Sequence, residues 1–544
     1  MNTGTRHLQL LSRDAAGCLS LRCTFGGLCR LVLLGLAALL AGCGTLPPPV
    51  ARAPTLSLAP DPAGVLSKTI VASMPPGEDS GFRLLPLGVY SLDARLQLVR
   101  RAQHSLDLQY YVFENDATGR MLLRYLKEAA LRGVRVRLLV DDLYTAGSQQ
   151  LLLALSATPN IEVRLFNPFC CARQQLLGRF TASLFALPRL NHRMHNKLFI
   201  ADGVMAIAGG RNIANDYFTL DPLQNFVDMD ALMVGKVVPQ LASIFDSYWN
   251  SPQVRPIESI VHAPGDRKLM QQNFDEWVNM AAPLPALTLP PNDILGYGPL
   301  GEELDAGRMG LIWGTARAFA DPPSKVKEQT DDGALATSVT LNVLQAMYKA
   351  QRDIYVVSPY LIPGERGMKA LRDVRARGVK VTILTNSLAA NDVPAVHTGY
   401  ARYRLRMLQT GVDLYELSPQ RTTRNRRLGM FGQSFGRLHA KMAVIDDRTV
   451  FIGSMNLDPR SATRNTELGV LVDSPQLARE MERVINITRL QSAYRLRLAP
   501  SGSSIQWLTT DGEKEIVLDT EPESSPAQRL YNFLLGPFVP ESLL

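Results

Sequence analysis

Cysteine is scarce in the body of this 544-residue chain, which contains six cysteines in all. Four of them lie within the first 43 residues, and only Cys170 and Cys171 lie beyond. A disulfide-stapled fold needs cysteines spread along the chain, and a structural zinc site needs four ligands at characteristic spacing. The sequence therefore predicts neither a disulfide-stapled fold nor a structural zinc site. We interpret Cys170 and Cys171 as ordinary thiols.

Long apolar runs are also missing. The most apolar stretch, LVLLGLAALLAG, follows Arg30 and is shorter than the ~20 residues that a membrane-spanning helix needs. A short apolar core that follows arginines and ends in small residues is typical of a secretory signal peptide. The residues from Leu40 to Cys43 resemble a bacterial lipobox, which implies lipidation of Cys43 and removal of residues 1–42. An uncleaved hydrophobic anchor is the alternative.

These features predict a lipid-anchored protein of the cell envelope of a Gram-negative bacterium, facing the periplasm. Gly44 after Cys43 favours the outer membrane by the enterobacterial sorting pattern, but the choice between inner and outer membrane stays open. Residues 43–80 are rich in proline at their start and predict a semi-extended tether.

A strong charge of one sign is the third missing feature. The net charge is +8 for the whole chain, and loss of residues 1–42 leaves 54 basic and 49 acidic residues, or +5. Such mild basicity suits an anionic partner. Because the sequence has no dense basic stripe, we expect no nucleic acid as partner.

The most informative feature of the sequence is an internal repeat. The segment RGVRVRLLVDD (132–142) matches RGVKVTILTNS (377–387), and IEVRLFNP (161–168) matches VDLYELSP (412–419). HNKLFIADGVMAIAGGRN (195–212) and HAKMAVIDDRTVFIGSMN (439–456) both read His-x-Lys-x4-Asp-x6-Gly-[Gly/Ser]-x-Asn. Three matches in the same order predict a duplicated domain.

Each half shows the same pattern of elements. A β-branched and aromatic run (105–113 or 353–362) precedes a helical stretch (119–133 or 367–378) that ends in glycine, and another strand follows. The fold class is therefore α/β, with two duplicated α-β-α sandwich domains packed pseudo-symmetrically around one active site. We predict a first domain over 81–260, a connecting segment over 261–308, a second domain over 309–500 and a C-terminal tail over 501–544.

The repeated motif places its polar side chains together. Alternation along a strand puts His195 and Lys197 on one face, and Asn212 follows a Gly-Gly turn where backbone can approach a ligand. The second copy supplies the corresponding residues His439, Lys441, Ser454 and Asn456. Two such sets around one groove form an electropositive site that suits a phosphoryl group, without metal or other cofactor.

Two imidazoles in one groove can divide the chemistry. One attacks phosphorus, and the other protonates the leaving alkoxide and later deprotonates the acceptor. Each needs an acceptor on its second ring nitrogen, and Asp228 and Glu467 are the candidates because each follows its asparagine and opens a strand. Asp230 competes with Asp228.

The doubled motif resembles the phospholipase D superfamily. That resemblance implies two halves around one active site and a covalent phosphohistidine intermediate formed without metal. The resemblance also implies which motif residues form the active site: His195, Lys197, Asp202, Asn212, His439, Lys441, Asp446 and Asn456. Among them, the aspartates have a mostly structural role. The carboxylates downstream of each motif orient the histidines. By analogy alone, the nucleophile is His195.

A closer resemblance extends from about Asp93 to the C-terminus. LTNSLAANDVPAVHTGYARYR and LHAKMAVIDDRTVFIGSMNLDPRS are similar to bacterial cardiolipin synthases of the C-type class. The resemblance implies transfer of a phosphatidyl group between phospholipids at a membrane surface, with phosphatidylglycerol and a second phospholipid such as phosphatidylethanolamine as substrates. Anionic and zwitterionic phospholipids are then the partners. Cardiolipin synthesis would suit the outer face of the inner membrane. The alternatives are a hydrolytic phospholipase D, a phosphodiesterase acting on nucleic acid and a non-catalytic envelope lipoprotein.

Several residues leave more than one interpretation open. Tyr111 and Tyr360 are candidates to line the groove, together with Ser454, but both tyrosines also suit a core. The arginines around 421–427 suit either headgroup phosphates or a solvated loop. The apolar tail fits a membrane or the body of the protein equally well.

Overall fold

The structure, a computed structural model, describes residues 46, 48, 52–183, 186–263, 265–279, 289–328, 330–424, 434–511 and 514–541. The predicted signal peptide and the lipidation site Cys43 lie outside the described residues, as do Arg426 and Arg427. Over the described ranges, no helix has both the length and the apolarity to cross a bilayer.

The two halves contain sheets with the same order of strands. In the first half the order is β9-β4-β3-β2-β5-β6-β8-β1, and in the second it is β18-β13-β12-β11-β15-β16-β17-β10. The ladders β4-β3-β2 and β13-β12-β11 are parallel and the others antiparallel. The predicted duplicated α/β fold is confirmed.

The strands of the first half are β1 (Ser80–Leu85), β2 (Ser105–Tyr110), β3 (Arg135–Asp141), β4 (Ile161–Phe166), β5 (Leu198–Ala201), β6 (Met205–Gly209), β7 (Gln224–Val227), β8 (Asp230–Gly235) and β9 (Val254–Pro256). Those that follow are β10 (Ile312–Ala320), β11 (Asp353–Val357), β12 (Lys380–Asn386), β13 (Asp413–Leu417), β14 (Phe435–Leu438), β15 (Met442–Ile445), β16 (Thr449–Gly453), β17 (Leu468–Asp473), β18 (Ala493–Leu498), β19 (Ile505–Asp511) and β20 (Lys514–Leu518).

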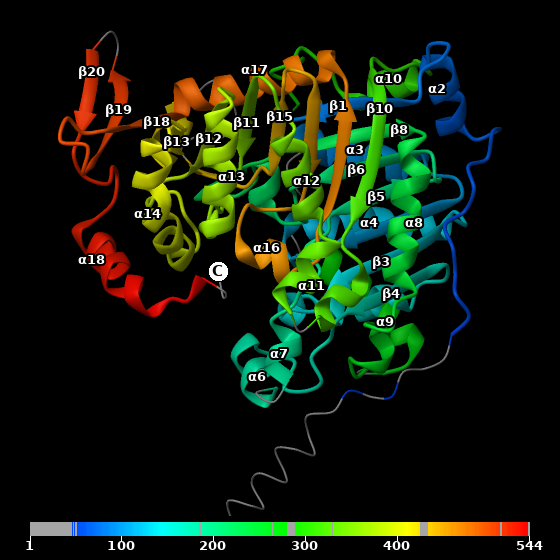
Figure 1. The fold of residues 1–544 in the computed structure, drawn as a ribbon. Helices are drawn as coiled ribbons and strands as arrows, with labels where there is room; N and C mark the ends of the chain where they lie inside the picture. The colour runs from blue at the N-terminus through cyan, green and yellow to red at the C-terminus, as the bar shows by residue number, and fades with distance from the viewer. Residues whose placement is uncertain are drawn as a thin grey trace, which may run out of the picture.

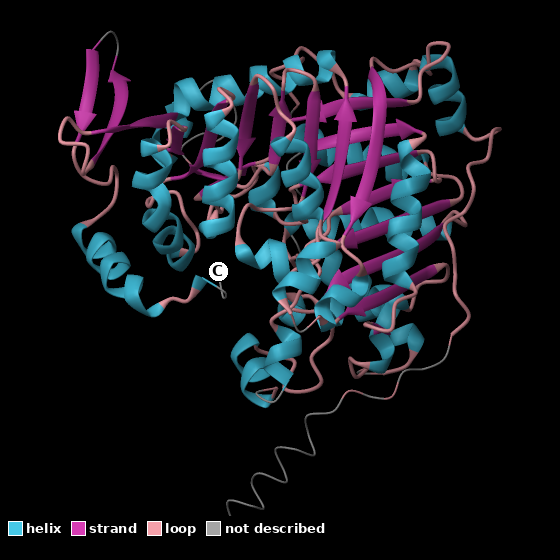
Figure 2. Cartoon of the chain, viewed as in Figure 1, coloured by secondary structure: helices cyan, strands magenta, loops and turns pink. Residues whose placement is uncertain are grey.

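Helices cover these sheets (Figure 2). The first half and the connecting segment contain α2 (Val65–Ser73), α3 (Gly88–Arg101), α4 (Ala117–Leu131), α5 (Gln149–Ser156), α6 (Leu176–Ala182), α7 (Leu187–Leu190), α8 (Val237–Trp249), α9 (Arg267–Asn279) and α10 (Leu300–Asp305). The second half contains α11 (Asp331–Ala336), α12 (Val339–Tyr348), α13 (Gly364–Ala376), α14 (Pro394–Gln409), α15 (Pro419–Arg424), α16 (Pro459–Thr463), α17 (Pro475–Ser492) and α18 (Pro526–Leu535).

Local sequence explains the matching helices α4 and α13. The side chain of Asp116 caps α4 by accepting from the backbone N–H of Gly119. Gly133 and Gly378, the residues expected to end the two helices, adopt φ values of 98° and 85°, a left-handed conformation that favours glycine.

One apolar core is shared by the two halves. Its buried members include Leu198 and Leu241 from the first half and Val444, Leu477 and Met481 from the second. β10 also joins the sheets, because its start pairs with β1 and the rest pairs with β17 (Figure 1). The halves are therefore fixed to one another by both backbone pairing and apolar packing.

The segment predicted as a tether packs on the first half over its described part. The backbone N–H of Ser57 donates to the Asp246 carboxylate at 2.8 Å. Leu66 and Ile70, four residues apart on α2, point into the first core. Their helical spacing gives the segment one apolar face to bury, so residues 65–73 form a helix and do not remain extended.

The described part of the predicted C-terminal tail forms two strands and a helix. β19 and β20 continue the second sheet beyond β18, and α18 lies against α14. In the connecting segment, α9 packs against α4 and α5, and α10 packs against α3.

Candidate active site

A two-stranded parallel ladder between the halves positions His439. β7 pairs with β14, and at its end the backbone N–H groups of His439 and Ala440 donate to the carbonyl of Val227 at 2.9 and 3.2 Å. Asp228 is the next residue, so its carboxylate lies 2.7 Å from Nδ1 of His439. The ladder therefore brings a carboxylate of the first half to a histidine of the second.

The reciprocal contact positions His195. Its backbone N–H donates to the carbonyl of Thr466 at 2.8 Å, and the N–H of Thr466 donates to the carbonyl of Arg193 at 2.9 Å. The carboxylate of Glu467 then lies 2.9 Å from Nδ1 of His195. Each histidine thus takes its carboxylate partner from the other half of the chain.

Asp230, the competitor of Asp228, has a different role. Its carboxylate accepts from Ser91 at 2.7 Å and from Arg95 at 3.0 Å, within the first half. The structure therefore places Asp228 beside the imidazole and Asp230 in a buried ion pair.

Both lysines are buried beside the histidine of their own motif. Lys197 Nζ donates to the carbonyl of His195 at 2.6 Å, and Lys441 Nζ donates to that of His439. Burial lowers the pKa of Lys441 to about 8 and that of Lys197 well below its usual value. Burial, with the charges of both lysines, likewise lowers the pKa of His439 to about 4 and that of His195 well below its usual value. The two motifs therefore contribute to one site.

The two carboxylates differ in charge. Burial raises the pKa of Glu467 to about 7, although Lys197 and the hydroxyls of Ser454 and Ser461 oppose the shift. For Asp228 the opposing effects prevail over burial, because His439 and Lys441 lower its pKa to about 2. Near neutral pH Asp228 is ionised, whereas Glu467 titrates.

The residues Gly210 and Ser454 occupy the same position in the two motifs. A Cβ on Gly210 would lie 2.1 Å from Oδ1 of Asp228, so a side chain there would displace that carboxylate. Ser454 instead donates its hydroxyl to Glu467, which also accepts from Ser461 at 2.8 Å. The Gly/Ser difference between the motifs therefore follows from the shorter carboxylate in the first half.

The two motif asparagines are both buried but differ in their hydrogen bonds. Asn212 accepts from the backbone of Val112 at 3.1 Å and donates to the Tyr217 hydroxyl at 2.9 Å. Oδ1 of Asn456 is buried, and within the described part of the chain it has no hydrogen-bond partner. Asn212 is therefore held by protein groups, whereas Asn456 has an oxygen left to accept a hydrogen bond.

The motif aspartates contact backbone. Asp202 accepts from the N–H groups of Gln103, His104 and Ser105, and Asp446 accepts from those of residues 351–353. Both aspartates have positive φ, 52° and 56°, in the turns that follow β5 and β15. These contacts indicate a structural role for Asp202 and Asp446 in the two turns.

Aromatic side chains pack on both imidazoles. The Tyr111 ring lies edge-on to His195 with centroids 5.1 Å apart, and Lys197 Nζ is 5.3 Å from the Tyr111 ring centre. Tyr360, the other predicted groove tyrosine, donates its hydroxyl to Asp392 at 2.8 Å. Tyr111 therefore lies at an imidazole, and Tyr360 contacts a carboxylate whose charge acts on Lys441.

Sequence reasoning missed several site residues. The rings of Tyr217 and Phe226 pack on His439 with centroids 5.1 and 5.0 Å away. The charge of Arg460, which donates to Asn191 at 2.9 Å, acts on His195. Tyr217 and Arg460 lie five and four residues after their motif asparagines. This spacing by itself does not indicate a role in the site.

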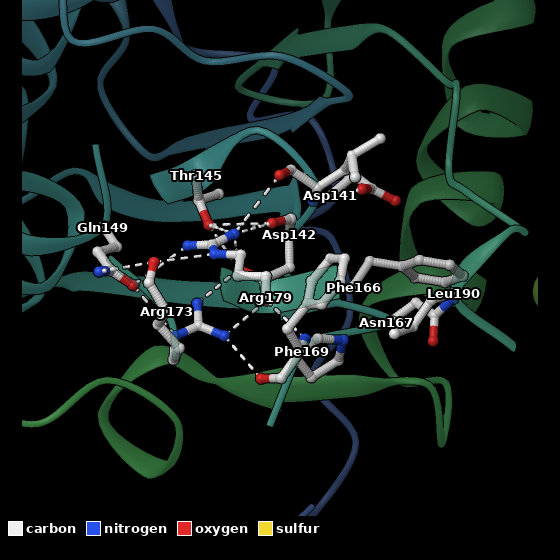
Figure 3. Close-up of polar contacts among 12 residues, drawn as sticks. Asp141, Asp142, Thr145, Gln149, Phe166, Asn167, Phe169, Arg173, Arg179 and Leu190 are labelled. Atoms are coloured by element: carbon white, nitrogen blue, oxygen red, sulfur yellow. Dashed lines mark hydrogen bonds and ion pairs between the residues drawn. The ribbon is translucent and has the colours of Figure 1, made fainter. Parts of the chain in front are cut away.

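A buried network of arginines and aspartates at the end of β3 holds the segment that carries His195, which leads into β5. Arg193 Nε donates to Asp141 at 2.8 Å, and the backbone N–H of Met194 donates to the same carboxylate at 2.8 Å. Beside it, Arg173 and Arg179 bind Asp142 (Figure 3). The network therefore fixes both the segment that carries His195 and the chain that leads into α6.

Other sequence candidates lie outside this arrangement. Nδ1 of His192 contacts the carbonyl of Pro188 at 2.8 Å, and the buried ring of His397 lies 3.6 Å from the Glu521 carboxylate. Arg421 donates to the carbonyl of Thr510 at 3.2 Å, in β19. No group of three or more His, Cys, Asp or Glu side chains in the described ranges is arranged to hold a metal ion.

Comparisons with known proteins show what the chain is similar to. The family described as "Cardiolipin synthase, PLD-like domain" matches residues 96–249 and 343–487. The chain is 39% identical over 459 residues to cardiolipin synthase C of Escherichia coli (strain K12), covering 84% of this chain and 94% of the relative. It is 27% identical over 419 residues to cardiolipin synthase A of Pseudomonas fluorescens (strain Pf-5), covering 76% of this chain and 69% of that one.

A solved structure shows the same fold. The crystal structure of phosphatidylserine synthase from Haemophilus influenzae Rd KW20 superposes with a TM-score of 0.54 at 14% identity, over 87% of this chain and 96% of that one.

Proposed function

The chain belongs to the cardiolipin synthase, phospholipase D-like family, and from this membership we propose that it forms cardiolipin by phosphatidyl transfer. One substrate is phosphatidylglycerol, and the second phospholipid is phosphatidylethanolamine or another phosphatidylglycerol. The observation that carries the proposal is the pair of histidines, each held by a carboxylate of the other half within one buried, lysine-lined site.

In the first step, Nε2 of His195 attacks the phosphorus of the donor lipid, because Nδ1 is occupied by Glu467. The bond from phosphorus to the leaving alcohol breaks, and His439 donates a proton to the alkoxide. Lys197 and Lys441 stabilise the charge on the phosphoryl oxygens.

Local electrostatics support this division of roles. Asp228 raises the pKa of His439 against the effect of burial, whereas the main influences on His195 are burial and cations that lower its pKa. Binding of an anionic phosphodiester raises the pKa of nearby bases. His439 is therefore the imidazole that holds a proton more readily, and His195 is the neutral nucleophile.

In the second step, His439 takes the proton from the hydroxyl of the acceptor phosphatidylglycerol. The acceptor oxygen attacks phosphorus, the phosphorus–nitrogen bond breaks, and His195 is released. With water as acceptor, the same site would yield phosphatidic acid, the product of a hydrolytic phospholipase D.

Purified protein with labelled phosphatidylglycerol, with and without phosphatidylethanolamine, tests the proposal. We expect labelled cardiolipin as the main product. Phosphatidic acid as the sole product would replace transfer by hydrolysis, and no turnover of any phospholipid would refute a phospholipid-transferring enzyme altogether.

The two histidines can be distinguished by trapping the intermediate. His195→Ala should form no covalent adduct, because the attacking nitrogen is lost. His439→Ala should lose roughly 10²–10⁴-fold in rate and accumulate an acid-labile phosphatidyl adduct on His195, detectable by mass spectrometry. An adduct on His439 in the His195→Ala variant would reverse the assignment.

For its location, we propose a lipid anchor at Cys43 in the cell envelope, facing the periplasm and a membrane surface. The sequence from Leu40 to Cys43 supports this placement. Radiolabelled fatty acid should be incorporated into the chain and not into Cys43→Ser, and equal labelling of both would rule out this anchor.

A further inference from the structure

The C-terminal helix α18 packs with its polar side toward the protein. Asn532 contacts Thr398, and Arg402 donates to the backbone carbonyls of Gly536 and Val539 just after the helix. No residue of α18 is buried. A helix on a globular domain normally turns its apolar side to the core, so the packing of α18 is reversed.

The apolar side of α18 is exposed as a consequence. Phe533 is 77% exposed, and Leu530, Tyr531 and Leu534 are each more than half exposed. Phe538, in the turn just after the helix, is 80% exposed. A capping box between Ser525 and Gln528 defines the start of the helix. Contiguous exposed apolar surface of this kind marks an interaction site.

α18 is connected to the candidate active site through α14. It is bound to Thr398, one turn into α14, and α14 begins two residues after Asp392. Asp392 accepts the hydroxyl of Tyr360 at 2.8 Å, and its charge acts on the site lysine Lys441. The apolar helix is thus attached at the same edge of the second sheet that carries the site.

Further exposed apolar side chains lie on segments that lead to the site, and we call them the apolar rim: Tyr144, Leu177, Leu223 and Phe435. The N–H of Phe435 donates to the carbonyl of Leu223, at the open end of the β7–β14 ladder. Four residues of strand separate Phe435 from His439, a span of ~13 Å.

The other two rim residues are linked to the His195 side of the site through intermediate residues. Tyr144 packs edge-on against Tyr111, with centroids 5.4 Å apart, and Tyr111 packs on His195. Leu177 lies on α6, between the anchoring residues Arg173 and Arg179 that bind Asp142 (Figure 3). In Figure 1, α18 lies at the left of the molecule and the α6–α7 pair projects at the bottom.

We propose that α18 and the apolar rim dock the protein on a phospholipid bilayer, with α18 lying in the interface between headgroups and acyl chains. The inference rests on the proposed function, in which both substrates are phospholipids. Leucine and phenylalanine suit the acyl boundary, and tyrosine suits the headgroup level. Docking on this face would let lipid headgroups enter the site while their acyl chains stay in the membrane.

Insertion of α18 can be measured locally in the full chain, reconstituted in phosphatidylglycerol–phosphatidylethanolamine vesicles. Leu534→Trp introduces a fluorophore on α18, and Leu490→Trp introduces one on α17, another exposed leucine position (63%). Brominated lipids should quench the added fluorescence of Leu534→Trp above the background of the native tryptophans and leave that of Leu490→Trp unchanged. Equal quenching of the two would overturn the proposal, whatever the enzyme's activity.

Activity provides the second test. The double substitution Phe533→Ser/Leu534→Ser should lower the rate on vesicles roughly tenfold or more, because it removes two large apolar side chains from the interface. The rate on detergent-dispersed short-chain phosphatidylglycerol should not change. Leu131→Ser/Leu490→Ser, a matched pair of exposed leucines elsewhere, should leave both rates unchanged.

The outcomes separate this inference from the proposed function. Quenching at position 534 without any phospholipid turnover would retain the docking face and reject the transferase. An unchanged vesicle rate in Phe533→Ser/Leu534→Ser, with normal circular dichroism, would reject the docking face alone. A dimer of the native chain that dissociates in that variant would show that α18 binds a second copy of the chain.

Discussion

At the scale of single residues, the two histidine–carboxylate pairs have the same geometry and different charges. Nδ1 of each imidazole lies within 2.9 Å of a carboxylate oxygen. The pKa of Asp228 is lowered to about 2, while that of Glu467 is raised to about 7. Only Asp228 is fully ionised across the neutral range, and the two halves therefore contribute unequally.

Neutral amide variants of the two carboxylates should differ in their pH dependence. Because Glu467 is mostly protonated below about pH 7, Glu467→Gln should lose least activity at pH 6 and progressively more toward pH 8. Asp228→Asn removes a charge that is present above about pH 2. The activity of this variant should therefore be lower by roughly 10²–10⁴-fold, by the same factor from pH 6 to pH 8. The measurement is kcat/KM against pH, and a flat ratio of native to Glu467→Gln rates would contradict the prediction.

The alkaline limb of the pH profile should report Lys441. Burial lowers its pKa to about 8, so the ammonium of the free enzyme is lost as pH rises through that value. Because the phosphoryl oxygens need this charge, kcat/KM should fall above about pH 8. Lys441→Arg, whose guanidinium stays protonated, should be slower overall but should move this limb to higher pH. An unmoved limb would assign it to another group.

At the scale of elements, short ladders between the halves position the chemistry. The β7–β14 pair ends at Asp228 and His439, and the Met194–Thr466 bridge ends at His195 and Glu467. Close approach of backbone at Gly210 completes the first of these contacts, because Asp228 fills the space that a side chain would need.

A methyl group at Gly210 should disturb this arrangement. Gly210→Ala places a Cβ 2.1 Å from Oδ1 of Asp228, so the carboxylate must move away from its present position against His439. We expect a loss of activity of tenfold or more and a fall of ~1–3 kcal/mol in the free energy of unfolding. Gly310→Ala is the control, because its Cβ would meet nothing closer than 4.0 Å. Native activity in Gly210→Ala would show that Asp228 does not need this position.

At the scale of the whole molecule, the two halves are packed as one structural unit. They share a buried core and a sheet that continues through β10. Neither half alone contains a complete histidine–carboxylate pair, because the partners lie 272 and 211 residues apart in sequence.

Unfolding should therefore be a single transition. In urea, far-UV circular dichroism and tryptophan fluorescence should give coincident curves, since tryptophans lie in both halves. Leu241→Ala, in the shared core, should lower the free energy of unfolding by ~2–5 kcal/mol and shift both curves together. Leu131→Ala, at an exposed site, should change it by less than ~0.5 kcal/mol. Separate transitions would show that the halves fold independently.

Local patterns in the sequence were enough to predict much of this protein. The matched spacing of the two motifs indicated a duplicated α/β fold and placed each histidine near its lysine. The expectation that a strand carries each pair was wrong, because β5 begins at Leu198 and β15 at Met442, just after the lysines. Asp228 and Glu467 were also identified as carboxylate candidates, because each follows its motif asparagine. Such inferences depend on period and spacing, which are properties of neighbouring residues along the chain.

Tertiary structure alone decided the rest. It paired each histidine with the carboxylate of the opposite half, separated Asp228 from Asp230, and turned the apolar side of α18 outward. Each outcome depends on which segments far apart in sequence come to lie together. The unequal pKa values of Asp228 and Glu467 have the same origin, because burial and neighbouring charges are properties of the folded molecule.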